Sequence, residues 1–139
     1  MKARPIEGLD PGSPLRENAA RIVGARLEEL RDLAADALDP AAVTAQHDMR
    51  IAAKRLRYVL EIVGPCLGPE AKAARRAARE LQGVLGEIHD CDVMLPRAAG
   101  IDSLAAALRD RRESLFARFR DLWQAEASRG TWAALERAL

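Results

Sequence analysis

The chain has 139 residues, which is enough for one hydrophobic core and too few for two comfortable domains. Its 22 Lys and Arg residues nearly balance its 21 Asp and Glu residues, so a net charge of +1 gives no argument for a nucleic-acid or membrane partner. Hydrophobic residues make up 49% of the chain but aromatic residues only 4%, so the core must be built from Ala, Leu, Ile and Val. That mixture favours close-packed helices over strands, and any basic site must arise from local arrangement.

The first residues do not resemble a targeting segment. Residues 1–7 lack the apolar run of a signal peptide, and no stretch of about 18 uncharged apolar residues occurs in the chain. We therefore expect a cytoplasmic protein with no membrane partner. Residues 1–12 are predicted to form a flexible tail, and residues 13–139 a single helical domain.

Prolines and glycines divide residues 13–139 into four long helical segments and one short one. Proline ends a helix because it lacks an N–H donor, but it is tolerated in the first turn, where that donor would be unpaired. Ser13 is expected to cap the first helix, Thr131 to cap the last, and Pro96 to lie beyond the end of the third. The predicted helices span about residues 14–38, 43–63, 69–95, 103–127 and 131–139.

No segment alternates between apolar and polar residues with the period of two that a half-buried strand requires, and the connections between helices are short. Helices joined by short connections pack antiparallel to their neighbours. The sequence therefore predicts an all-α fold, an antiparallel up-and-down four-helix bundle with a short C-terminal helix.

The second predicted helix carries a basic face. At 100° per residue its apolar residues gather on one side, and the opposite arc of about 100° holds the first basic stripe, His47, Arg50, Lys54, Arg57 and Tyr58. Like charges at i and i+4 cost about 0.2–0.5 kcal/mol each, and arginine can bond two phosphate oxygens at once, so an anion would relieve the repulsion. A solvated helix surface is the alternative. For His47 the alternative to an anion contact is an ordinary surface or capping histidine. For Tyr58 it is a side chain that packs without donating its hydroxyl.

The third predicted helix repeats this design with a second basic stripe, which consists of Lys72, Arg75, Arg76 and Arg79. Only residues 64–68 link the two helices, so they should pack side by side and form two walls of one groove. Gly83 and Gly86 continue the same arc. A glycine inside a helix costs about 1 kcal/mol relative to alanine, so these two indicate close approach of another helix or of a ligand, and the helix is the more common reason.

Three segments combine these residues with a pair of His-Asp doublets: His47-Asp48-Met49-Arg50, Lys54-Arg55-Leu56-Arg57-Tyr58 and Leu85-Gly86-Glu87-Ile88-His89-Asp90-Cys91-Asp92-Val93. Together they resemble the CHAD family, the conserved histidine α-helical domain. The resemblance extends from about Leu9 to Arg97, with a weaker echo at residues 108–112.

The resemblance implies a helical bundle whose basic groove binds inorganic polyphosphate and that has no enzymatic activity of its own. We also expect no cofactor and no metal site. It implies phosphate contacts from His47, Arg50, Lys54, Arg55 and Arg57, and less directly from Arg76 and Arg79. With Tyr58, Lys72 and Arg75 from the two stripes, these residues make up the predicted site. Typical members carry two such units in tandem and this chain holds one, so we expect either weaker binding by one unit or a homodimer that completes the groove.

The two His-Asp doublets leave an enzymatic alternative open, a metal-dependent phosphohydrolase of the HD type. His89 and Asp90 point about 100° apart on a helical wheel, which is awkward for binding one ion. Asp92 falls on the core side of its helix, which suggests a structural partner such as a buried arginine.

A helical protein–protein adaptor is the other alternative, because four aromatic residues cluster near the C-terminus: Phe116, Phe119, Trp123 and Trp132. Such residues anchor partners, but closing one end of a bundle is their more common use. Nucleic acid is disfavoured as a partner, because aromatic residues are not interleaved along the basic stripes to stack on bases.

Overall fold

The computed structural model covers residues 1–139 and contains helices but no strand, which confirms the predicted all-α bundle. Five α-helices and one 3₁₀ helix follow one another along the chain: α1 Leu15–Ala37, α2 Val43–Val63, η1 Gly64–Cys66, α3 Pro69–Arg97, α4 Asp102–Arg129 and α5 Thr131–Ala138. None of these helices combines the length and the apolar composition that crossing a bilayer requires.

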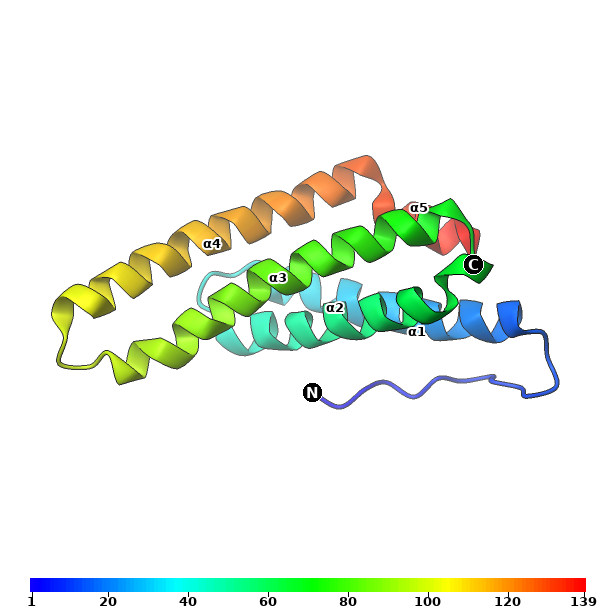
Figure 1. The fold of residues 1–139 in the computed structure, drawn as a ribbon, viewed down its shortest axis with the longest axis horizontal. Helices are drawn as coiled ribbons and strands as arrows, with labels where there is room; N and C mark the ends of the chain where they lie inside the picture. The colour runs from blue at the N-terminus through cyan, green and yellow to red at the C-terminus, as the bar shows by residue number, and fades with distance from the viewer.

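The four long helices run antiparallel to their sequence neighbours (Figure 1). α2 packs against α1 and α3, and α3 packs against α2 and α4. No Cα atom of α4 comes within 8 Å of α1 or α2, so α5, which contacts α1, α3 and α4, joins the C-terminal part of the chain to the first helix. The α3–α4 hairpin projects beyond the ends of α1 and α2 (Figure 1).

The core consists mainly of small and branched aliphatic side chains, as the composition predicts. Twenty-six buried residues form one continuous cluster with members in all five α-helices. α2 and α3 each bury alanines at 0% exposure, which lets their backbones approach closely: Ala52, Ala53, Ala74 and Ala78. Phe116, Phe119 and Trp132 are also buried in this cluster, which confirms the predicted use of the C-terminal aromatics in core packing.

The predicted end of the third helix is wrong, because α3 continues through Pro96 to Arg97. Pro96 removes only one backbone hydrogen bond, and it does so in the last turn, where the helix is about to end. The Ala98 N–H donates to the carbonyl oxygens of Met94 and Leu95, each at 3.1 Å, and closes that turn. A proline this close to a helix end is therefore tolerated.

Two predicted helix caps are also wrong. Thr131 is the first residue of α5, and Gly130 precedes it in the left-handed conformation at φ 71°. The Thr131 hydroxyl donates to the Glu126 carboxylate instead of capping the helix. Ser13 likewise donates to the Asp10 carboxylate at 3.0 Å and makes no cap bond to α1.

A buried acid holds the N-terminal residues, which lie along the bundle (Figure 1). The Arg4 N–H donates to Glu29 of α1, and Arg26 donates to the Arg4 carbonyl oxygen at 2.7 Å. The Glu29 carboxylate also pairs with Arg26 at 2.7 Å and lies 3.8 Å from Arg55 of α2. Only 1% of the Glu29 side chain is exposed, so this carboxylate joins the N-terminal segment, α1 and α2 away from solvent.

Neutralising Glu29 should destabilise the fold. In a Glu29→Gln variant, Arg26 stays buried without its carboxylate partner, and breaking a buried ion pair costs about 3 kcal/mol. We expect the free energy of unfolding, measured by urea denaturation, to fall by about that amount. The exposed neighbour Glu28 provides the control, and Glu28→Gln should change stability by less than about 0.5 kcal/mol. Equal losses in the two variants would contradict the role assigned to Glu29.

Candidate functional site

A polar recess of about 360 Å³ lies between α2 and α3, and none of its lining residues is hydrophobic. We call it the central recess. It is lined by Arg50, Arg57, Arg79, Gln82, Gly83, Gly86, Glu87 and Asp90. Arg50 and Arg57 belong to the first basic stripe and Arg79 to the second, so side chains of both stripes meet here.

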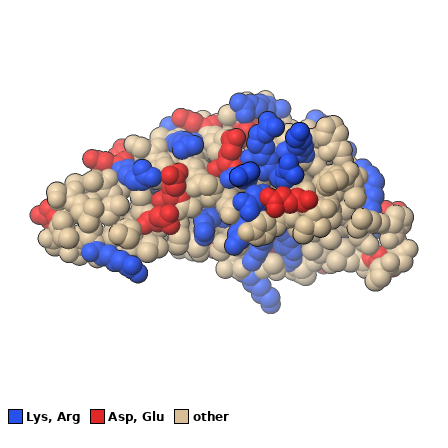
Figure 2. Space-filling view, viewed as in Figure 1, with Lys and Arg blue, Asp and Glu red and all other residues tan.

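The stripes face solvent because the opposite sides of their helices are in the core. On α2, Met49 and Leu56 are 0% exposed, and on α3, Leu81 and Leu85 are 0% and 1% exposed. The short link through η1 sets the two helices side by side, so their polar sides point in a similar direction. Figure 2 shows the result as a group of Lys and Arg side chains near the centre of one face, with few Asp and Glu side chains among them.

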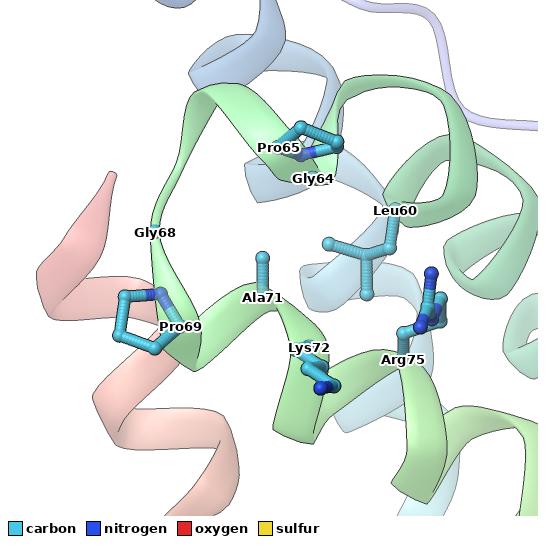
Figure 3. Close-up of a pocket in the computed structure, with 8 residues that line it drawn as sticks. All are labelled: Leu60, Gly64, Pro65, Gly68, Pro69, Ala71, Lys72 and Arg75. Atoms are coloured by element: carbon cyan, nitrogen blue, oxygen red, sulfur yellow. The ribbon is translucent and has the colours of Figure 1, made fainter.

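A second recess of about 300 Å³, the turn recess, lies where α2 passes into α3 (Figure 3). Its lining residues are Leu60, Gly64, Pro65, Gly68, Pro69, Ala71, Lys72 and Arg75. Lys72 and Arg75 lie on the first turns of α3 (Figure 3). Arg79 follows Lys72 by about two turns and Arg75 by about one. The second basic stripe therefore leads from the turn recess to the central recess.

Tyr58 lies at the outer edge of the first stripe. Its ring centroid is 4.6 Å from the Arg57 guanidinium carbon and 5.6 Å from the Lys54 amine, so both cations make cation–π contacts with it. Lys54 and Tyr58 are exposed and line neither recess. Arg76 is on the other flank of α3, where it faces α4 together with Arg79.

Arg55 lines neither recess. Its guanidinium turns toward α1, 3.8 Å from Glu29, and donates to the Met1 carbonyl oxygen at 2.7 Å. The resemblance implies a phosphate contact for Arg55, whereas the structure places it in the cluster that holds the N-terminal residues. On the helical wheel Arg55 stands about 60° outside the basic arc, beyond Tyr58, where the neighbouring helix decides its partner.

Most cations of the two stripes have no carboxylate partner. Arg57 lies 3.3 Å from Glu61. Six others have no Asp or Glu oxygen within 4.0 Å, namely Arg50, Lys54, Lys72, Arg75, Arg76 and Arg79. Their mutual repulsion is uncompensated within the molecule, so an anion that contacts several of them would relieve it.

His47 stacks on His89 where α2 begins, beyond Arg50. The ring centroids are 4.4 Å apart and the planes differ by 27°. Burial, and after it the neighbouring His89 and Arg50, lowers the pKa of His47 below its ordinary value of 6.5. Its Nδ1 atom is buried without a hydrogen-bond partner. The histidine pair therefore lies outside both recesses and leaves one buried ring nitrogen, Nδ1 of His47, that the fold does not use.

Three polar residues of the central recess, Gln82, Glu87 and Asp90, stand outside the predicted stripes. Gln82 follows Arg79 by three residues, a spacing that could have indicated it, and its Oε1 atom is buried without a partner. Glu87 lies 3.1 Å from Arg111 and 4.0 Å from Arg118, both on α4. That contact depends on how α4 packs, and the spacing within α3 carries no signal for it.

Gly83 and Gly86 line the central recess, and no helix packs against them. A Cβ atom at Gly83 would meet nothing within 4 Å, and one at Gly86 would meet only Arg50 Nε, at 3.5 Å. The expectation that close helix packing explains these glycines is therefore wrong. Their cost to the helix, about 1 kcal/mol each relative to alanine, has no compensation in the packing.

Asp92 pairs with Arg112 of α4, which confirms the predicted arginine partner. Arg112 also donates to the Gln46 side chain and to the Pro40 carbonyl oxygen, so it ties α4 to the beginning of α2. No three His, Cys, Asp or Glu side chains converge so as to hold a metal ion. The two His-Asp doublets thus do not form a common ligand set.

The sequence profile of the CHAD domain matches residues 2–99, which is most of the 139-residue chain. The chain belongs to the CHAD domain family. That family is associated with polyphosphate binding in general. No curated protein and no solved structure matches the chain.

The CHAD match covers the N-terminal segment and helices α1 to α3, and with them both basic stripes. It begins earlier than the resemblance over residues 9–97 predicts, and so includes the segment that Glu29 holds. α4 and α5 lie outside the match, as does the weaker echo at residues 108–112. Arg112 of that echo nevertheless contacts Asp92 inside the CHAD match.

Acidification should destabilise the CHAD fold through His47. Because the folded-state pKa of His47 is lowered, the unfolded chain binds its proton more tightly. The stability contributed by neutral His47 is present above pH 6.5 and is lost as the pH falls toward the lower folded-state pKa. We expect the free energy of unfolding from urea denaturation to decrease as the pH falls below 6.5, and to decrease less in a His47→Gln variant. Identical pH dependence in the two proteins would show that His47 is not the titrating group.

Proposed function

We propose that this CHAD domain binds inorganic polyphosphate, or a similar phosphate-rich polyanion, on the face formed by the two basic stripes, and that it catalyses no reaction of its own. The observation that carries the proposal is the group of six cations without carboxylate partners on two adjacent helices. A cytoplasmic location stays a prediction from the sequence.

A phosphate chain suits this arrangement of charge. Every phosphate unit carries negative charge and directs oxygens to several sides, so cations from both helices can bond to it at once. Arg50 and Arg57 on α2 and Arg79 on α3 offer planar forks that can each hold two oxygens. Lys72 and Arg75 continue the positive surface into the turn recess, so a long chain would gain further contacts there.

Nucleic acid suits the site less well. No aromatic side chain lines either recess, so bases would find no surface on which to stack. Tyr58, the aromatic residue of the first stripe, already contacts Arg57 and Lys54 through its ring. Backbone phosphates alone would give binding without sequence preference.

The two alternatives have less support than polyanion binding. An HD-type phosphohydrolase needs several ligands around one ion, whereas His47 and His89 stack on one another and no third ligand joins them. An adaptor would present aromatic anchors, but Phe119 and Trp132 are 0% and 3% exposed.

Reversing three charges of the first stripe should remove most of the polyphosphate binding. In the variant Arg50→Glu/Lys54→Glu/Arg57→Glu, each lost contact to a charged group is worth about 1.5–3 kcal/mol, so affinity should fall at least about 100-fold. Isothermal titration with long-chain polyphosphate at low salt measures this loss. Wild-type affinity should itself weaken steeply as salt rises, because bound counterions are released.

The control carries the same change of charge outside the two stripes. Arg16, Arg21 and Arg137 lie on α1 and α5, are exposed and have no carboxylate within 4.0 Å. Changing all three to Glu should reduce affinity far less than changing the first stripe. Equal losses would mean that binding follows net charge alone, and a wild-type protein that does not bind polyphosphate would overturn the function.

We also propose that a second copy of the chain completes the groove by docking on the free end of the α3–α4 hairpin. Residues 102–114 of α4 bury no side chain. Four apolar side chains at this end are 41–53% exposed, namely Val93, Met94, Ile101 and Leu104. Unpaired charges of both signs neighbour them along the chain, namely the bases Arg97 and Arg109 and the acids Asp90, Asp102 and Asp110. In a twofold arrangement the acids of one copy can meet the bases of the other.

The position of this surface supports the same arrangement. Val93 and Met94 continue the arc of α3 that carries the second basic stripe. A copy that docks there would therefore place its own groove next to this one.

Sedimentation velocity at micromolar concentration, with and without polyphosphate, tests this association. We expect a dimer for the wild type and a monomer for Met94→Glu/Leu104→Glu, whose side chains are exposed enough for the fold to tolerate the change. Ile62→Glu is the control, because Ile62 is 78% exposed but lies on α2. A monomeric wild type in both conditions would remove the dimer and leave polyphosphate binding untouched.

A further inference from the structure

We propose that Gly83 and Gly86 form a bare strip on α3 where one phosphate group lies directly against the helix, between the arginines of the central recess. This inference rests on the proposed function, and the arginines define the site. The glycines determine how closely the ligand approaches. The arginines attract the phosphate chain, and the glycines let it fit closely against the helix.

Neither conformation nor packing accounts for these two glycines. Both have ordinary helical backbone angles, since the positive φ values of the chain belong to other glycines. The space above Gly83 is open, and a Cβ atom added at Gly86 would have only the flexible Arg50 side chain nearby, at 3.5 Å. Alanine would fit at both positions and would favour the helix, so a reason outside the folded chain is needed.

The surroundings of the strip point to an anion. Arg50 lies beside Gly86, and Arg57 and Arg79 line the same recess. Two carboxylates also line it, Asp90 and Glu87, and Glu87 is approached by Arg111 and Arg118 of α4, so the arginines outnumber the acids. Arg57 Nε is 3.3 Å from Glu61 but makes no well-directed hydrogen bond, so the Arg57 guanidinium is not fully satisfied within the fold. A phosphate oxygen would satisfy it.

The bare strip also favours an unbranched phosphate chain over a nucleic acid. A methyl group on either glycine would stand in the recess and move a phosphate away from the arginine forks. An unbranched phosphate chain can lie flat against the bare helix, because it carries nothing but oxygens around each phosphorus. A nucleic acid, with a sugar and a base on every phosphate, would stay farther out and would not use the strip.

The experiment compares Gly83→Ala, Gly86→Ala and the double variant with Gly24→Ala, a control in α1 where a Cβ would meet only Leu139 at 3.6 Å. Each single change should raise the melting temperature by about 3 °C, because alanine favours the helix. Affinity for long-chain polyphosphate should fall about tenfold in each recess variant and stay unchanged in the control. No charge is altered, so the salt dependence of binding should keep its slope.

A single-stranded oligonucleotide supplies the second readout, and its affinity should be the same for wild type and the recess variants. Wild-type polyphosphate affinity in the double variant would overturn the inference while leaving the proposed function intact. A lower melting temperature in the recess variants would show that the glycines serve packing, which would also overturn it. Failure of the wild type to bind polyphosphate at all would instead overturn the proposed function.

Discussion

The close packing of α2 against α3 is the constraint on which the site depends. The two helices lie side by side. Both bury alanine at full depth, Ala52 and Ala53 on one and Ala74 and Ala78 on the other, and such small core side chains permit close approach of helix backbones. The two basic stripes are therefore near enough for Arg50, Arg57 and Arg79 to line one recess. Larger residues at these core positions would move the arginines apart, and one phosphate could not reach both walls.

Charge is distributed differently in the framework and in the site. At contacts that join elements of the fold, acids and bases are paired. Glu29 pairs with Arg26 under the N-terminal segment, and Asp92 pairs with Arg112 between α3 and α4. Along the two stripes most cations have no such partner. His47 belongs to the first stripe, and its lowered pKa keeps the ring from adding a further positive charge there at neutral pH. The repulsion that remains is the kind of cost that a polyanion removes when it binds.

Helices and stripes could be predicted from the sequence because both depend on local rules. Proline and glycine mark the breaks, and the bounds of α2 agree with the prediction at both ends. A helical wheel shows which side of a helix is basic, but it does not show which helix lies next to each edge. Arg55 is the example, since only the neighbouring Glu29 of α1 decides its partner. The stacking of His47 on His89 likewise depends on the register between two antiparallel helices, which no single-helix pattern contains.

α4 lies outside the CHAD match, yet its arginines pair with acidic residues inside the matched segment. Arg112 pairs with Asp92 and reaches Gln46, which fixes the end of α3 against the beginning of α2. Arg111 and Arg118 approach Glu87, the carboxylate at the rim of the central recess. Opposite charges at this distance offset one another, so the field that Glu87 would otherwise project into the recess is reduced. α4 thus supports the central recess without contributing a lining residue to it. It fixes the end of α3, and its arginines neutralise an acid that would oppose the ligand.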